Sequence, residues 1–254
     1  MLVTAAALPT ILACTLALVA GGAVKGLISI GLPLVGLPLL MLAVDVQTAV
    51  NLLAVPIMLS NLMQAIEGPD TLAILRRFLP IQIPLAIGTY FGTALLAVLE
   101  PRVLLLAVGA FTVAFGTLGL LQPRLVIPAA LERWLGPPVG LAAGLIGGMS
   151  TLFGPVLTLF VVGLNLPPNV FVKGISILYT TAGALLMISG AAHGTASSGD
   201  LLVSAVGIIP VYGGMLIGQR LRNRLNAERF RLVVLVTVVV TGANMIRTGL
   251  GFTL

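Results

Sequence analysis

The sequence predicts an all-α polytopic membrane protein, and three observations lead to that fold class. The 254 residues are 59% hydrophobic and only 8% charged, with a mean hydropathy of +1.18. Most of the chain consists of apolar runs, and roughly 20 apolar residues suffice to cross a bilayer as a helix. Two of these runs are interrupted by glycine and proline in the same pattern. Soluble domains carry about 25% charged residues, so this chain could not cover a water-facing surface.

The chain divides into eight hydrophobic units, which are joined by short stretches with turn and charge signals. In order they are 5–43, 47–66, 78–99, 103–121, 138–163, 169–191, 201–219 and 231–249. The first and fifth units, 5–43 and 138–163, are the broken ones. No connection is long enough for a soluble domain, so residues 1–254 are expected to form a single membrane domain.

The two broken units are copies of one motif. Residues 20–34 recur as residues 142–156, and the matched pairs are Gly22 with Gly144, Gly26 with Gly148, Ser29 with Thr151, and Pro33 with Pro155. A Pro-x3-Gly-x3-Gly pattern also occurs twice, at 84–92 and 210–218. Glycines four residues apart let a neighbouring helix approach closely, so ordinary helix packing explains this second pattern. Together the patterns predict a duplication, with one repeat at about 5–121 and the other at about 138–249.

The distribution of Lys and Arg favours inverted repeats. If every unit crosses once, seven basic residues lie inside and five outside. If the two broken units are re-entrant and return to the side they came from, ten lie inside and only Arg102 and Arg247 lie outside. The second topology fits the excess of basic residues in cytoplasmic loops better. It leaves three full spans in each repeat, an odd number, which inverts one repeat relative to the other.

The paired breaks predict a polar site in the middle of the membrane. Non-helical backbone at that depth is tolerated only where it is buried in protein or lines a cavity. Pro33 and Pro155 suit the first turn of a helix, because their missing N–H groups would be unpaired there anyway. Two helix N-termini, with the hydroxyl groups of Ser29, Ser150 and Thr151, would form an anion site. The alternative is a proline kink within a continuous helix.

Five more polar residues within apolar runs are candidates for binding substrate. An ammonium group in the membrane, such as that of Lys25, is costly and suggests a function, unless the side chain reaches back to the surface. The same two interpretations apply to Lys173. Asn51, Asn61 and Thr181 are the remaining candidates, and Asn61 and Thr181 occupy equivalent positions in the two repeats. Each could instead make a hydrogen bond between helices.

The absence of certain residues from the apolar runs excludes several classes of function. All seven acidic residues lie in or beside predicted loops, so no carboxylate is placed to bind a cation within the membrane. The only histidine, His193, is in a loop, and Cys14 is the only cysteine, so we expect neither a metal site nor a cofactor. No Walker motif is present, and no acid, base and nucleophile come together, which argues against an ATPase or another enzyme. The net charge of +6 comes from arginines in loops, where they set orientation, so nucleic acid is not an expected partner.

The chain resembles the sulfite exporter TauE/SafE family of membrane proteins. The resemblance rests on the duplicated motif at 20–34 and 142–156, on the segments 84–92 and 210–218, and on the plan of two similar halves. It implies export of a small sulfur-containing anion, such as sulfite or an organosulfonate, across a bacterial inner membrane.

We therefore expect a secondary transporter that moves a small anion outward by alternating access. A passive anion channel is the alternative, since the same pore chemistry would serve it. The expected partners are the anion and membrane lipid, and a homo-oligomer is compatible with the sequence.

Overall fold

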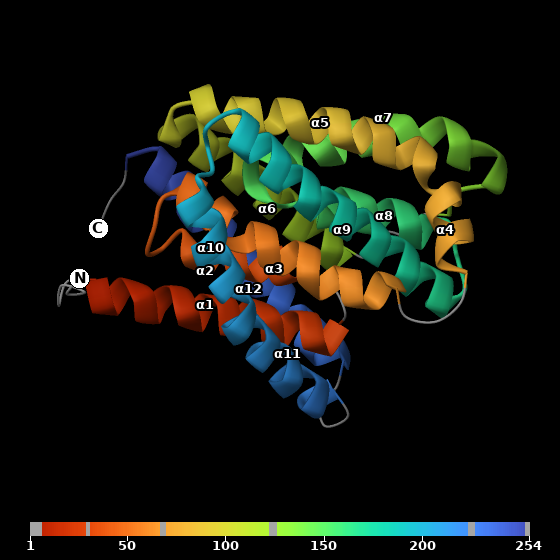
Figure 1. Cartoon of the computed structure of the whole chain (residues 1–254). Helices are drawn as coiled ribbons and strands as arrows, with labels where there is room; N and C mark the ends of the chain where they lie inside the picture. The colour runs from red at the N-terminus through yellow and green to blue at the C-terminus, as the bar shows by residue number, and fades with distance from the viewer. Residues whose placement is uncertain (1–6, 29–30, 67–69, 122–125, 223–226, 252–254) are drawn as a thin grey trace.

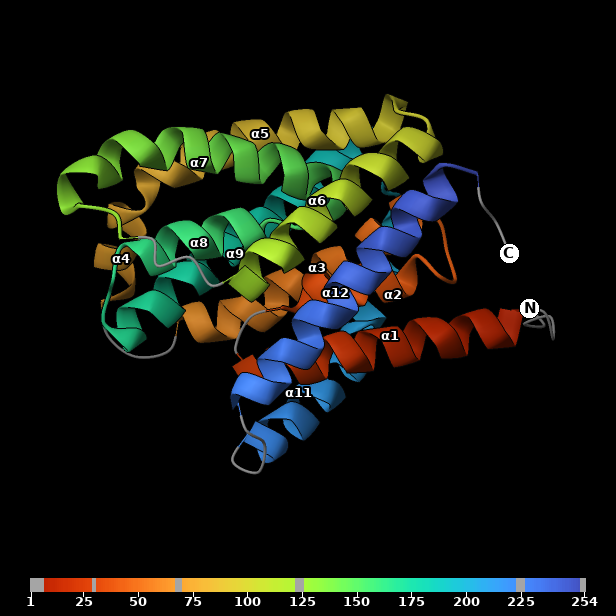
Figure 2. The ribbon, with the colours of Figure 1, turned by 180° about the vertical axis from the view of Figure 1, so that it is seen from behind.

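The computed structural model describes residues 7–28, 31–66, 70–121, 126–222 and 227–251, and the regular elements in these ranges are all helices. In chain order they are α1 (Ala7–Ile28), α2 (Leu32–Leu40), α3 (Val46–Ile66), α4 (Thr71–Arg77), α5 (Leu79–Val98), α6 (Pro101–Leu121), α7 (Ala129–Ser150), α8 (Gly154–Gly163), α9 (Pro168–Ala192), α10 (Ser198–Val206), α11 (Ile208–Arg222) and α12 (Ala227–Gly249). They form one bundle (Figures 1 and 2).

The chain leaves the helical conformation in both copies of the motif. α1 ends at Ile28 and α2 begins at Leu32, while α7 ends at Ser150 and α8 begins at Gly154. Pro33 lies in the first turn of α2, and the equivalent proline lies in the first turn of α8. Each motif therefore separates two helices instead of kinking one.

The helix before the second break begins earlier than the predicted bounds of the fifth unit. The fifth unit was predicted to begin at residue 138, but α7 already begins at Ala129 and contains Pro137 and Pro138. A proline inside a helix removes a backbone hydrogen bond and crowds the preceding turn, at a cost of about 3 kcal/mol, but its φ angle stays close to the helical value, and α7 continues through both prolines. At 1.5 Å per residue, the 22 residues of α7 extend about 33 Å, whereas the 10 residues of α8 extend about 15 Å. Of the two helices, only α8 has about half the length needed to cross the bilayer. The first broken unit is alike: α1 has 22 residues, and the short helix α2 has 9.

Each long–short helix pair starts and finishes at one end of the bundle. The backbone N–H of Ile127, just before α7, donates to the carbonyl of Gly163 at the end of α8, at 2.7 Å. Figures 1 and 2 show that α1 begins and α2 ends near the N-terminus, which we call the N-terminal end. The α5–α6 junction and the end of α12 lie there too. α4, the start of α7 and the end of α11 lie at the opposite end, which we call the α4 end.

Glycines bring two pairs of helices into close contact. α1 packs along α11, and α5 packs along α7. A Cβ atom added at Gly22 or Gly26 of α1 would collide with the backbone of α11, and one added at Gly144 or Gly148 of α7 would collide with that of α5. The glycines of the Pro-x3-Gly-x3-Gly segments make equally close approaches from the facing helices; they are Gly88, Gly92, Gly214 and Gly218. These segments therefore serve helix packing.

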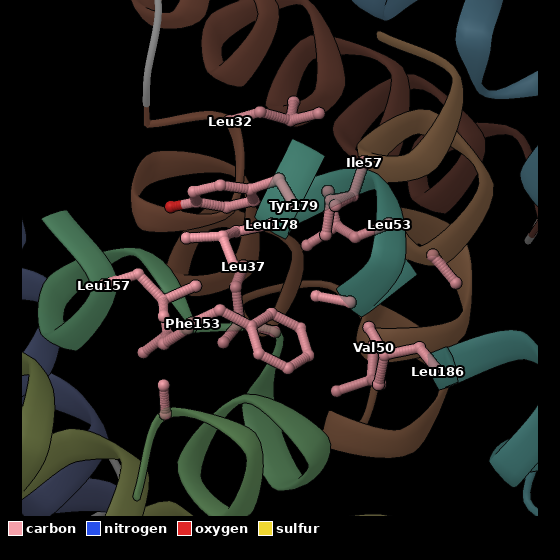
Figure 3. Packing of buried hydrophobic residues seen from close by; sticks show 14 of the residues in the cluster. Leu32, Leu37, Val50, Leu53, Ile57, Phe153, Leu157, Leu178, Tyr179 and Leu186 are labelled. Carbon is pink, nitrogen blue, oxygen red and sulfur yellow. The ribbon is translucent and has the colours of Figure 1, made fainter. Parts of the chain in front are cut away.

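The short helices are buried in the centre of the bundle. Leu37 of α2, Leu53 of α3, Leu157 of α8 and Leu178 of α9 are fully buried. Figure 3 shows these side chains converging with Phe153, which precedes α8. The outer helices instead carry many exposed apolar side chains, among them Leu16, Ile83, Ile188 and Leu202. Six helical segments of the described residues are long and apolar enough to cross a membrane, so the chain is an integral membrane protein with a lipid-facing outer surface.

Asp45 caps the start of α3. Its carboxylate accepts hydrogen bonds from the backbone N–H of Thr48 at 3.0 Å and from the Thr48 hydroxyl at 2.6 Å. Partial burial raises the pKa of Asp45, but the hydrogen bonds from Thr48 and neighbouring backbone groups together bring the pKa below its usual value.

Candidate functional site

A small enclosed cavity lies at the break between α1 and α2. Its lining comes from α1, α2, α3 and α9, and consists of Lys25, Gly31, Leu32, Pro33, Asn61, Ile175 and Tyr179. The cavity volume is about 10 Å³, close to the smallest space that holds one water molecule. Three of the predicted site residues, Lys25, Pro33 and Asn61, are thus brought together.

Lys25 supplies a positive charge in the interior. Its side chain is 2% exposed, and its Nζ donates a hydrogen bond to Oδ1 of Asn61 at 2.7 Å. Asn61 is held in this orientation because its Nδ2 donates to the carbonyl of Ile57, also at 2.7 Å. Asn61 is neutral, so it satisfies one N–H of the ammonium group without balancing its charge. An ion pair between Arg77 and Glu132 lies at another place in the bundle.

The N-terminus of α2 faces the same cavity. Gly31 precedes the helix with a φ of 110°, in the left-handed region that glycine adopts readily, and no side chain caps the helix. The first N–H groups of a helix have no acceptor within it and carry a partial positive charge. Together with the Lys25 ammonium group, they make this wall of the cavity attractive to an anion.

Tyr179 links this cavity to the N-terminus of α8. A Cβ atom added at Gly154, the first residue of α8, would collide with the Tyr179 hydroxyl group, so the two residues are in close contact. Tyr179 also lines the cavity, and Figure 3 shows its ring beside Leu32 of α2, with Phe153 and Leu157 beyond it. The N-termini of both short helices thus approach one tyrosine.

Ser150, Thr151 and Pro155 lie at the second break and do not line the cavity that holds Lys25. The Ser150 Oγ donates to the carbonyl of Ile146 at 2.6 Å and accepts from the N–H of Leu152 at 3.3 Å. Thr151 has a φ of 61°, an unfavourable value for a β-branched residue, and its backbone N–H caps α7. Its fully buried Oγ1 has no hydrogen-bond partner among the described residues, so this hydroxyl remains available for a ligand.

Three other predicted site residues make hydrogen bonds elsewhere in the bundle. The Asn51 Nδ2 donates to the carbonyl of Thr195 at 2.6 Å, which ties α3 to the segment between α9 and α10. The Thr181 hydroxyl donates to Gln82 of α5 at 2.9 Å. The Lys173 Nζ donates to the Thr71 hydroxyl at 3.2 Å, at the α4 end. Ser29, the tenth predicted residue, lies outside the described residues.

Sequence reasoning did not select four residues that line the cavity: Gly31, Leu32, Ile175 and Tyr179. Three of them are apolar or lack a side chain, so nothing in their chemistry distinguishes them from core residues. Tyr179 carried a usable signal, because it is a polar residue inside the apolar run of α9. In the part of the chain that the structure describes, no group of three His, Cys, Asp or Glu side chains could hold a metal ion.

Comparison with known proteins yields one match. The family described as Sulfite exporter TauE/SafE matches residues 13–245 of the chain. No curated protein and no solved structure matches it.

Proposed function

Because the chain belongs to the sulfite exporter TauE/SafE family, a family of membrane transporters, we propose that it is a secondary transporter that exports a small anion by alternating access. Sulfite and small organosulfonates are the proposed substrates, and a bacterial inner membrane is the proposed location. The proposed substrate site is the cavity around Lys25 and Asn61, extended through Tyr179 toward Thr151 and the N-terminus of α8.

The single observation that carries the proposal is the buried Lys25 ammonium group beside an uncapped helix N-terminus. Taking an isolated charge out of water costs several kcal/mol, so proteins pair such charges. Asn61 contributes a carbonyl oxygen but no negative charge. A bound sulfite or sulfonate would supply that charge and would accept hydrogen bonds from both the ammonium and backbone N–H groups.

We further propose that the two halves are inverted repeats. Reciprocal packing supports this: the first helix of each half, α1 or α7, packs along the fifth helix of the other half, α11 or α5. Within each pair, equivalent glycines make the close approach. The re-entrant topology is supported by the hydrogen bond from Ile127 to Gly163 and by the location of Arg76, Arg77 and Arg133 at the α4 end, away from Arg102. The α4 end would then be cytoplasmic.

The size of the cavity favours a carrier over an open channel. A cavity of about 10 Å³ has room for one water molecule but not for a sulfite ion. Substrate must therefore enter after α2, α8 or the neighbouring helices move apart. The α1–α11 and α5–α7 pairs, held by glycine contacts along their backbones, would be the rigid bodies that move relative to each other.

A flux assay tests the proposal. Purified protein in liposomes is given radiolabelled sulfite, an organosulfonate and a carboxylate of similar size, with and without a pH gradient. We expect saturable flux of the sulfur anions and little flux of the carboxylate. Absence of flux for every anion would refute the transport function. Unitary currents in a planar bilayer, with flux that does not saturate, would refute the carrier mechanism in favour of a passive anion channel.

A further inference from the structure

A second, larger pocket opens to the surface at the α4 end, away from Lys25. Its volume is about 410 Å³, within the range of roughly 300–1,000 Å³ that is typical of small-molecule sites. Residues from α4, α5, α7 and α8 form it, namely Arg76, Arg77, Phe78, Pro80, Ile81, Glu132, Arg133, Gly136 and Phe160. Figure 1 shows α4 beside the end of α7 at which this pocket lies.

The pocket combines a charged rim with an apolar floor. Phe78, Ile81 and Phe160 are buried and form the floor, whereas Arg76 and Arg133 are exposed at the rim. A floor of this kind excludes water from one side of a bound ion, which strengthens its interaction with the charges above. The arrangement suits a ligand with a charged head and a small apolar part.

One arginine is fixed in place, and the pocket keeps a positive excess. The Arg77 Nε and Nη2 donate to the two carboxylate oxygens of Glu132 at 2.8 and 2.7 Å. This pair of hydrogen bonds joins α4 to α7. The hydrogen bond to Glu132 is also the main reason why the pKa of Arg77 is raised. Three guanidinium groups face one carboxylate, so Arg76 and Arg133 are not neutralised by Glu132. Planar guanidinium groups bind the oxygens of tetrahedral oxyanions in pairs.

The opposite end of the molecule has no such charges at the matching positions. The offsets of the two glycine patterns match Arg76 and Arg77 to Leu202 and Val203, and match Glu132 and Arg133 to Thr10 and Ile11. Leu202 is 69% exposed and Val203 is 58% exposed. The arginines are thus a feature of one end only and not of the shared architecture.

We infer that the pocket between α4 and α7 binds a tetrahedral oxyanion, through Arg76 and Arg133, with Arg77 held in place by Glu132. Two sources could supply this group: a free sulfur or phosphorus oxyanion, or the phosphate of an anionic lipid headgroup. Trp134, which is 80% exposed next to Arg133, has the position of a residue at the membrane interface, where both sources are within reach.

With a free oxyanion, the pocket would concentrate substrate at the cytoplasmic end only, which would favour loading from that side. This loading role rests on the transport function proposed above, whereas the binding itself does not. Exposed charges act over about 8–10 Å at physiological salt, so the effect should weaken as ionic strength rises.

The single tryptophan allows a direct binding test. The full chain is reconstituted in nanodiscs of neutral phosphatidylcholine and titrated with sulfate at constant ionic strength, with Trp134 fluorescence as the signal. The variants are the double substitution Arg76→Gln/Arg133→Gln and, as a control that removes one exposed arginine at the same end but outside the pocket, Arg220→Gln. We expect the double variant to bind sulfate about tenfold more weakly, corresponding to one decade in Kd per 1.4 kcal/mol. We expect the control to change the affinity by less than about twofold, since its charge lies outside the pocket.

A second arm identifies the source of the oxyanion. The same proteins are placed in nanodiscs that contain phosphatidylglycerol, and the thermal unfolding temperature is measured. Stabilisation by phosphatidylglycerol that is lost in the double variant, without a sulfate response, assigns the pocket to the lipid phosphate. A sulfate response assigns it to the free anion. No difference between wild type and double variant in either arm overturns the proposal.

Flux measurements separate this proposal from the transport function. If sulfate binding depends on Arg76 and Arg133 while no anion is transported, the transport proposal fails and the pocket stands. If transport occurs, the double variant should raise KM for loading from the α4 end and leave the maximal rate unchanged. An unchanged KM would overturn the loading role. Arg133→Lys, which keeps the charge, should recover part of the affinity.

Discussion

Replacing Lys25 by methionine is the sharpest test of the central site. Methionine keeps the length and apolar part of the side chain but removes the ammonium group. At an effective dielectric constant of about 20, unit charges about 4 Å apart attract each other by ~4 kcal/mol, which is an upper limit for a bound anion. Desolvation of both groups reduces this, and hydrogen bonds to charged groups typically contribute about 1.5–3 kcal/mol. We therefore expect a 10- to 150-fold loss of anion affinity.

The assay compares Lys25→Met with Lys173→Met. Both lysines are buried in helices, but Lys173 contacts Thr71 at the α4 end and does not line the cavity. Sulfite-dependent thermal stabilisation and initial flux are measured for both variants in the same lipid. Lys25→Met should lose both responses, and Lys173→Met should keep the anion response even if it unfolds at a lower temperature.

The stability of the ligand-free Lys25→Met variant gives an independent check. Removing a buried charge that has only a neutral partner should leave the unfolding temperature unchanged or raise it. A drop in stability with normal anion affinity would show that Lys25 is structural. Wild-type affinity in Lys25→Met, together with lost affinity in Lys173→Met, would refute the placement of the site.

Gly26→Val should lower the free energy of unfolding by about 2–3 kcal/mol because its side chain collides with the backbone of α11. Gly213→Ala, where nothing lies within 4 Å of the added Cβ, should not lower it; equal losses in thermal melts would contradict the packing argument. In a background without the native cysteine, Glu100→Cys should react with a membrane-impermeant maleimide on intact cells and Arg76→Cys should not, and the reverse result would refute the orientation. Asp45→Asn should reduce the unfolding temperature near neutral pH, and the difference from wild type should shrink as the pH falls below the usual aspartate pKa of about 3.9, because a carboxyl with a lowered pKa stabilises the fold only while it is ionised. A difference that persists at low pH would show that the amide itself disrupts the cap.

Part of the central site was predictable from residue types. A lysine within an apolar run and a proline after a glycine-rich break identify Lys25 and Pro33, because charges and broken helices are costly in a membrane. Asn61 is one of several polar residues in apolar helices, and its residue type does not distinguish it from the others. Asn51 and Thr181 satisfied the same criteria, yet Asn51 bonds the segment between α9 and α10, and Thr181 bonds Gln82 of α5. Residue type alone does not distinguish these cases, because an amide or hydroxyl group can bind a substrate or can make a hydrogen bond within the protein.

The pocket at the α4 end could not be predicted from the sequence, although its arginines are plain in it. From the sequence, Arg76, Arg77 and Arg133 indicate membrane orientation, because basic residues in short loops concentrate on the cytoplasmic side. The pocket that these arginines form depends on the contact between Arg77 of α4 and Glu132 of α7, which are 55 residues apart in the chain. That juxtaposition results from the glycine contacts between α5 and α7.

The amino-acid sequence alone predicts the membrane environment, the helical class, the two breaks and a lysine within the first broken unit. These properties follow from composition and local pattern, because a bilayer accepts only long apolar runs whose backbone hydrogen bonds are satisfied. The structure also shows that α7 continues through two prolines. Helix packing sets which polar residues share the cavity with Lys25, and it brings Tyr179 against the start of α8 while its side chain lines the cavity at the start of α2. Those outcomes depend on the direction in which each side chain points once the helices have packed, and no local pattern specifies that direction.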